Sequence, residues 1–329
     1  MRDGSAMSER RVVAVVGATA TGKTALGEAL AESIGGEVVC ADSRQVYREL
    51  EIGTGKPSPT ERAARPHHLF DGQPLGARAS AGWFGRAARE VCAAIHARGR
   101  VPVLVGGSGL YLEAARKGLS PAPPAAPEIR ARLRREAAEA GIEALHARLR
   151  HLDPATAARL APRDTQRITR ALEVLEASGR PLSAWLGEAA GPAVAGEWRV
   201  IEITLAPRPL AERIERRTHQ MFEQGLVEET GALLAAGHAD ALRALRAVGY
   251  DEAMELLAGR LARAEAEART SLRTRQLAKR QRTWFRNRVE ALRLDAAAGE
   301  NALLAAALAA ARRPAFQPSA TESRRRNSG

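Results

Sequence analysis

A glycine-rich segment near the N-terminus has the residue types and spacing of a phosphate-binding loop. Residues 17–24 read GATATGKT and match the pattern G-x-x-x-x-G-K-[ST]. A β-branched run precedes the segment at 12–16 and a helical pattern follows it at 23–34, so backbone amides at a helix N-terminus would face an anion. Lys23 can add positive charge at the terminal phosphates, and the Thr24 hydroxyl suits Mg²⁺. The predicted site comprises Gly17, Ala18, Thr19, Ala20, Thr21, Gly22, Lys23 and Thr24.

An acidic residue is expected at the same edge of the fold. Asp42 directly follows a predicted buried strand at 38–41, and the carboxyl ends of parallel strands face the ligand crevice in such sheets. The carboxylate there can take a proton from an amine nucleophile, cap the next helix, or hold Mg²⁺ through water. Spacing alone leaves these roles open.

The next predicted strand, at 101–105, ends in Gly106-Gly107-Ser108. It lacks the acid with which ATPases and most small-molecule kinases support Mg²⁺. The set of residues needed for nucleotide hydrolysis is therefore incomplete. A group transfer with diphosphate as leaving group stays open, because the loop then needs only to bind and stabilise the departing charge.

The elements that must position these groups form an α/β fold. Alternating strands (12–16, 38–41, 101–105) and helices (23–34, 83–97) predict a parallel sheet with helices on its faces. Four prolines within 120–127 mark a boundary, and the chain then has only helical patterning up to 191. An alternating strand at 199–205 predicts a return to the sheet, and the stretch 209–293 reads as helical. We predict a discontinuous core domain (1–119 and 196–311), an all-helical insertion domain (120–195) and a basic, disordered tail (312–329).

The net charge of +12 is concentrated near the C-terminus. Residues 260–293 contain eleven basic and three acidic side chains, the tail 312–329 contains five and one, and the remainder is balanced. This concentration favours a polyanionic partner. An arginine-rich compositional bias is the alternative, although bias alone would not concentrate the imbalance. At helical spacing the charges form two stripes: Arg269, Arg273, Gln276 and Arg280, and Arg275, Lys279, Arg282 and Arg286. Acidic partners four residues away are nearly absent, which predicts little neutralisation.

Composition excludes several classes of protein. A chain that is 45% hydrophobic can bury a core, so global disorder is excluded. Two cysteines cannot build a disulfide framework, and no window approaches the roughly 18–20 apolar residues of a membrane span. We expect a cytoplasmic protein with no membrane partner. The adjacent His67 and His68 point apart on a strand, which favours hydrogen bonding over a metal site.

Nine ordered motifs over about residues 12–290 resemble those of the tRNA dimethylallyltransferases (tRNA isopentenyltransferases). They are GATATGKT (17–24), DSRQVY (42–47), IGTGKP (52–57), HHLFD (67–71), GRVPVLVGGSGLY (99–111), DTQRITRALEV (164–174), RIERRTHQM (213–221), VGYDE (248–252) and TRQLAKRQRTWFR (274–286). The resemblance implies a P-loop nucleoside-triphosphate-hydrolase-like core, related to nucleoside kinases, with a helical insertion that grips the anticodon stem-loop of tRNA.

The implied reaction transfers a dimethylallyl group from dimethylallyl diphosphate to the N6 amine of adenosine 37, immediately 3′ of the anticodon, and releases diphosphate. The implied cofactor is Mg²⁺, and we expect a monomer. A small-molecule or nucleoside kinase of the same fold is the alternative. It would need a strand-end acid and an ATP-binding lid.

The resemblance also implies residue roles. Asp42 corresponds to the general base, Ser108 stands where the family usually has threonine, and Arg217 corresponds to an arginine that assists at the diphosphate. Ala79 replaces a frequent tyrosine, which puts that contact in doubt. The residues expected to contact tRNA are Asp42, Ser43, Arg44, Gln45, Ser108, Arg130, Gln166, Arg167, Ile168, Thr169, Arg170, Arg275, Lys279, Arg280 and Arg282.

Overall fold

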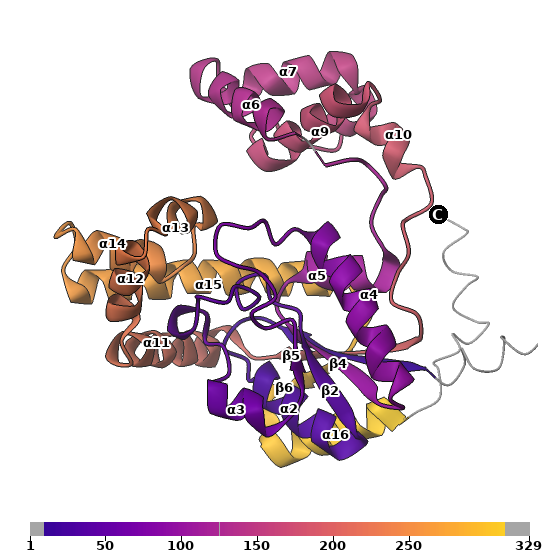
Figure 1. Cartoon of the computed structure of the whole chain (residues 1–329), viewed down its shortest axis with the longest axis vertical. Helices are drawn as coiled ribbons and strands as arrows, with labels where there is room; N and C mark the ends of the chain where they lie inside the picture. The colour runs from indigo at the N-terminus through magenta and orange to yellow at the C-terminus, as the bar shows by residue number, and fades with distance from the viewer. Residues whose placement is uncertain (1–9, 125, 313–329) are drawn as a thin grey trace, which may run out of the picture. The chain divides into compact units, whose positions relative to one another are not determined.

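The computed structural model describes residues 10–124 and 126–312 (Figure 1). The chain divides into two compact units, of which the second is Lys117–Pro192 and the first comprises the chain on either side of it. The predicted insertion, 120–195, differs from the second unit by three residues at each end. The predicted basic tail, apart from Arg312, lies outside the described residues.

The first unit is built on a six-stranded sheet with the order β3-β2-β4-β1-β5-β6. All neighbouring strands are parallel. The strands are β1 (Arg11–Gly17), β2 (Gly36–Cys40), β3 (His67–His68), β4 (Val101–Gly106), β5 (Glu197–Thr204) and β6 (Leu292–Asp295). The four predicted strands are confirmed as β1, β2, β4 and β5. Their apolar runs are almost fully buried, as expected for strands covered on both faces.

The expectation that 209–293 is wholly helical is wrong at its end, because β6 begins at Leu292. This edge strand has one neighbour, β5, and three of its four residues are exposed. It therefore carries no buried apolar run that a sequence pattern would reveal. The strand β3 is shorter still, with two residues, and it confirms the expectation that His67 and His68 lie on a strand.

Helices cover both faces of this sheet. On one face, Val12, Ala14 and Val39 pack in a cluster that includes Phe84 and Phe285. On the other face, alternate residues of the same strands pack against helices α2, α11 and α16. The helical elements of the first unit are α2 (Lys23–Ile34), η1 (Ile52–Thr54), α3 (Pro59–Ala64), α4 (Ala81–Ala97), α5 (Gly109–Lys117), α11 (Pro207–Glu223), α12 (Leu226–Ala235), α13 (Ala239–Leu245), α14 (Tyr250–Leu257), α15 (Arg263–Arg288), η2 (Ala296–Ala298) and α16 (Glu300–Arg312).

The described part of the second unit is helical, with its own core. Its elements are α6 (Pro127–Glu139), α7 (Ile142–Leu152), α8 (Pro154–Ala157), α9 (Thr165–Ser178) and α10 (Leu182–Leu186). Leu133, Leu149, Ile168 and Leu172 are fully buried together, so this unit has a hydrophobic core of its own. Over the described residues of both units, no helix is long and apolar enough to cross a membrane.

Candidate active site

The phosphate loop lies between β1 and α2, as predicted. Gly17, Ala20 and Gly22 adopt positive φ angles of 148°, 64° and 90°, and a Cβ on Gly17 would lie 2.4 Å from the carbonyl oxygen of Ile203. The loop is therefore tightly wound against β5. The Thr21 hydroxyl donates to the carbonyl of Ala18 at 2.8 Å and stabilises this turn. The geometry fits a loop whose amides surround an anion.

Two cations lie at this loop, the buried Lys23 and the half-buried Arg217. The Lys23 ammonium donates to the carbonyl of Ala18 at 3.2 Å. The Arg217 guanidinium, from α11, donates to Thr19 Oγ1 at 3.2 Å and to the carbonyl of Thr54 at 3.3 Å. Burial lowers the pKa of Arg217, and the carboxylate of Asp42 opposes that shift. The structure thus brings Asp42, Lys23 and Arg217 into one electrostatic cluster.

Burial lowers the pKa of Lys23 to about 8, with Asp42 raising it and Arg217 lowering it. The free protein therefore loses this positive charge as the pH rises through about 8. We expect its affinity for Mg²⁺-diphosphate to fall across that range, because the neutral amine no longer attracts the anion. Isothermal titration calorimetry from about one unit below to about one unit above that pKa measures the change.

Lys23→Met is the control for this titration. The diphosphate ionises in the same way with either protein, but the variant has no lysine that titrates at this position. The wild-type affinity should decline more steeply with pH than the affinity of this variant. Parallel profiles would contradict the assignment of the pH dependence to Lys23.

Asp42 follows β2 at the carboxyl edge of the sheet, as predicted. Its Oδ1 accepts from the backbone N–H of Arg44 at 2.9 Å, so one carboxylate oxygen orders the turn. The Ser108 hydroxyl oxygen accepts from the backbone N–H of Ser43 at 2.8 Å. Ser108 therefore ties the turn that carries Asp42 to the end of β4. The side chains of Asp42 and Ser108 line a pocket of about 540 Å³ that also includes Thr19, Arg217 and Arg280.

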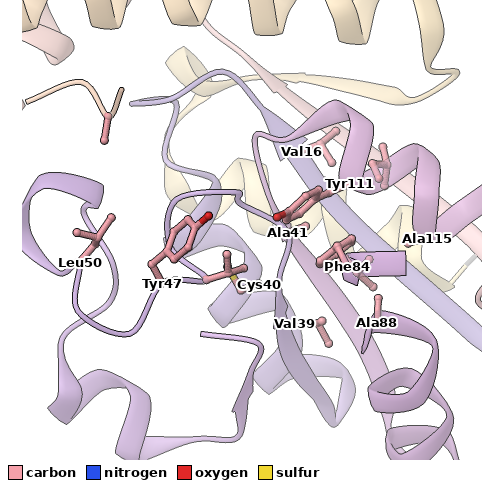
Figure 2. Close-up of a cluster of buried hydrophobic side chains, with 14 of the residues drawn as sticks. Val16, Val39, Cys40, Ala41, Tyr47, Leu50, Phe84, Ala88, Tyr111 and Ala115 are labelled. Carbon is pink, nitrogen blue, oxygen red and sulfur yellow. The ribbon is translucent and has the colours of Figure 1, made fainter. Parts of the chain in front are cut away.

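An aromatic cluster lies beneath this turn. Phe84 and Tyr111 stack with their ring centroids 4.1 Å apart, next to Val39 and Cys40 (Figure 2). The Tyr111 hydroxyl donates to the carbonyl of Ala79 at 2.7 Å. The backbone of Ala79 is thus fixed whatever its side chain, although the contact that a tyrosine would make there is missing.

A second loop, residues 51–56, completes the surroundings of Arg217. Gln45 Nε2 donates to the carbonyls of Thr54 and Gly55 at 3.2 and 2.9 Å, and a Cβ on Gly55 would lie 1.9 Å from Arg217 Nη2. Glu229 accepts from the backbone N–H of Ile52 at 2.7 Å. Lys56 is buried and donates to Asp71 at 2.7 Å, so this lysine anchors the loop.

Glu229 and Tyr250 have structural roles that the sequence did not predict. The Tyr250 hydroxyl donates to Glu229, and a Cβ on Gly53 would lie 2.4 Å from the Tyr250 ring. The motif VGYDE contains the tyrosine and was the available signal, whereas Glu229 lies in no motif. A second pocket, of about 810 Å³, lies beside this loop and includes Lys23, Thr24, Lys56 and Arg217. Arg217 thus lines both pockets.

The expectation of little charge neutralisation along the basic helix α15 is wrong in part. Partners four residues away are indeed scarce, but acids on other elements approach the helix. Arg273 pairs with Asp251 and Glu252, and Arg275 pairs with Glu215. Within the described part of the chain, six exposed basic residues of 260–293 have no ion pair: Arg269, Lys279, Arg280, Arg282, Arg286 and Arg288.

Four residues of α15 are predicted to contact tRNA. Three of them form no ion pair within the described residues: Lys279, Arg280 and Arg282. Arg280 lines the pocket of Asp42. Lys279 and Arg282 line a separate pocket of about 580 Å³ beside β5 and α11. The fourth, Arg275, forms an ion pair with Glu215.

In the second unit, the predicted RNA contacts divide into exposed and buried side chains. Gln166 and Arg167 are exposed at the start of α9. Ile168 is fully buried and Thr169 is 8% exposed. The prediction that these two side chains contact tRNA is therefore wrong, because both are buried within the unit. Arg130 forms a bidentate ion pair with Glu173 at 2.5 and 2.8 Å. Arg170 donates to the carbonyl of Pro123 at 3.0 Å.

No group of three or more His, Cys, Asp or Glu side chains is placed to hold a metal within residues 10–124 and 126–312. His67 Nε2 lies 3.3 Å from Glu28, and His68 Nε2 lies 2.6 Å from Glu37. This confirms the predicted hydrogen-bonding role of the two histidines.

Comparison with known proteins agrees with this geometry. The family model for IPP transferase matches residues 45–288, and the model for isopentenyl transferase matches residues 10–73. The chain belongs to the IPP transferase family. A tRNA dimethylallyltransferase of Halorhodospira halophila is 46% identical over 294 residues, covering 87% of this chain and 93% of the relative.

Two solved structures resemble this IPP transferase. The full-length tRNA isopentenylpyrophosphate transferase from Bacillus halodurans has a TM-score of 0.65 and 33% identity, covering 92% of this chain and 98% of that one. A eukaryotic dimethylallyltransferase acting on tRNA has a TM-score of 0.73 and 25% identity, covering 88% of this chain and 74% of that one. The predicted α/β fold class is confirmed, and both relatives are transferases.

Proposed function

We propose that this protein is a tRNA dimethylallyltransferase. It transfers a dimethylallyl group from dimethylallyl diphosphate to the N6 amine of adenosine 37, 3′ of the anticodon. The observation that supports this reaction most is the position of Arg217. It lines one pocket with Asp42 and with Thr19 of the phosphate loop, and a second pocket with Lys23 and Thr24. The names of the relatives support the substrate class.

The phosphate loop binds the diphosphate of the donor. As the bond between the allylic carbon and the diphosphate oxygen breaks, negative charge grows on the diphosphate. Arg217 is held by Thr19 and Thr54 before the substrate binds. Preorganised donors of this kind stabilise developing charge without paying for reorganisation during the reaction.

Asp42 acts on the acceptor. An exocyclic adenine amine is a poor nucleophile and needs positioning and proton removal. As its nitrogen forms the bond to the allylic carbon, the N6 proton passes to the Asp42 carboxylate and the diphosphate leaves. Ser108 supports this step by fixing the turn at Ser43, and its hydroxyl proton can be donated to the nucleotide.

The RNA supplies its base from a single-stranded loop, where extrusion from the stack costs least. Arg280 at the pocket wall and the exposed Lys279 and Arg282 suit the phosphate backbone. Gln166 and Arg167 offer polar groups from the insertion. We propose that the enzyme acts as a monomer, and a tRNA substrate supports a cytoplasmic location.

The residues present fit a Mg²⁺ ion bound mainly through the substrate. Thr24 lies in the first turn of α2 and is half-buried, and its hydroxyl makes no hydrogen bond within the described residues. Mg²⁺ in phosphate sites is commonly bound by one or two protein oxygens, substrate phosphates and water. When bound, the ion supplies charge neutralisation at the diphosphate, and Thr24 would be its ligand.

Labelled dimethylallyl diphosphate tests the proposed activity. With Mg²⁺ and unmodified tRNA, the purified protein is expected to transfer the label to RNA, and chelation of Mg²⁺ is expected to prevent transfer. Labelled ATP is the parallel assay. Phosphoryl transfer from ATP without label transfer to tRNA would replace the proposal with a kinase.

A further inference from the structure

The amide of Gln281 joins the phosphate loop to the turn after β4. Its Oε1 accepts from the backbone N–H of Thr19 at 2.9 Å. Its Nε2 donates to the carbonyl of Gly107 at 3.0 Å. Thr19 presents a donor and Gly107 an acceptor, so one orientation of the glutamine amide satisfies both partners.

The backbone beneath α15 is shaped for this contact. A Cβ on Gly107 would lie 2.4 Å from Gln281 Nε2, and one on Gly109 would lie 2.2 Å from the Trp284 ring. Two glycines therefore allow the helix to lie directly on the turn that contains Ser108. Since Trp284 is one helical turn beyond Gln281, the two contacts fix the register of α15 on this turn.

The two partners of Gln281 belong to opposite sides of the proposed reaction. Thr19 belongs to the loop that binds the diphosphate and also contacts Arg217. Gly107 adjoins Ser108, whose hydroxyl fixes the turn that carries Asp42. A single side chain thus ties the donor half of the site to the acceptor half.

We infer that Gln281 is a positioning residue that sets the separation between the bound diphosphate and the adenosine amine. The inference rests on the proposed transferase function. Reacting atoms must approach to about 3–3.5 Å, and a displacement of about 1 Å can cost 100-fold in rate. Methionine at this position keeps the length of the side chain but makes neither hydrogen bond.

Gln281→Met tests the inference in single-turnover transfer with both substrates saturating. The expected rate is between about tenfold and 100-fold below wild type. The dissociation constants for anticodon stem-loop RNA and for Mg²⁺-diphosphate should stay within about threefold. A merely structural role would instead lower the melting temperature and weaken binding together with the rate. Asn287→Leu, an exposed amide on the same helix, is the matched control and should transfer at the wild-type rate.

A Gln281→Met rate within twofold of wild type would overturn the inference. So would weakening of diphosphate binding by as much as the rate, because Gln281 would then serve donor binding alone. If this variant does not fold, Gln281→Asn, which is too short to reach both partners, is judged by the same two criteria. An inactive wild-type protein would count against the proposed function, whereas an active wild type with an equally active Gln281→Met counts against this inference alone.

Discussion

Replacing Asp42 with asparagine is expected to lower the rate of dimethylallyl transfer by about 10²- to 10⁴-fold, the range for loss of a general base. Asparagine has nearly the same shape, and its carbonyl oxygen can still accept from the N–H of Arg44, a bond of 2.9 Å in the wild type. The turn should therefore survive, while the group that takes the N6 proton is lost. Single-turnover transfer measures the chemical step.

Binding measurements separate this loss of chemistry from a loss of structure. The affinity for anticodon stem-loop RNA should change by no more than a few-fold, and the diphosphate should bind as well or better, because a negative charge near Lys23 and Arg217 has been removed. Asp240→Asn is the matched control, since Asp240 is fully exposed on α13, where it pairs with Arg243. Near-normal turnover of Asp42→Asn would show that Asp42 is not the base.

Replacing Arg217 with lysine is expected to cost about 10²- to 10³-fold in kcat, as for loss of a donor to developing negative charge. Lysine keeps the charge but lacks the planar fork whose Nη1 donates to Thr19 and whose Nη2 donates to Thr54. The KM for the donor should rise less than kcat falls, because the charge on the leaving group is greatest in the transition state. Steady-state kinetics with the donor varied gives both constants.

Arg216→Lys is the control for this variant. Arg216 is the preceding residue on α11 and is exposed, so the substitution should leave kcat unchanged. An Arg217→Lys variant that loses donor affinity and keeps its kcat would assign Arg217 to ground-state binding instead.

The sequence was most informative where one pattern determines the backbone. The phosphate loop was predictable because glycines, a preceding strand and a following helix are all required for its geometry. The position of Asp42 at the carboxyl edge of the sheet was predictable because this residue follows a buried strand. The functional roles of Ser108 and Arg217 came from resemblance. The structure shows how each is held, by Ser43 in one case and by Thr19 and Thr54 in the other.

Tertiary contacts explain what the sequence analysis missed. The pairing of Arg275 with Glu215 joins residues 60 positions apart, and helical spacing along α15 cannot reveal it. Likewise, Gln281 reaches Thr19 across 262 residues. Ile168 lies within a motif that resembles an RNA-binding segment, yet its side chain is on the core face of α9.

Mapping the transferred group on one defined tRNA tests the central claim most directly. An unmodified transcript with adenosine 3′ of its anticodon is incubated with the protein, Mg²⁺ and dimethylallyl diphosphate, then digested and analysed by mass spectrometry. The prediction is one dimethylallyl group on N6 of that adenosine, and none when guanosine replaces it. Modification elsewhere in the transcript, or an unmodified transcript with a folded and diphosphate-bound protein, would contradict the account.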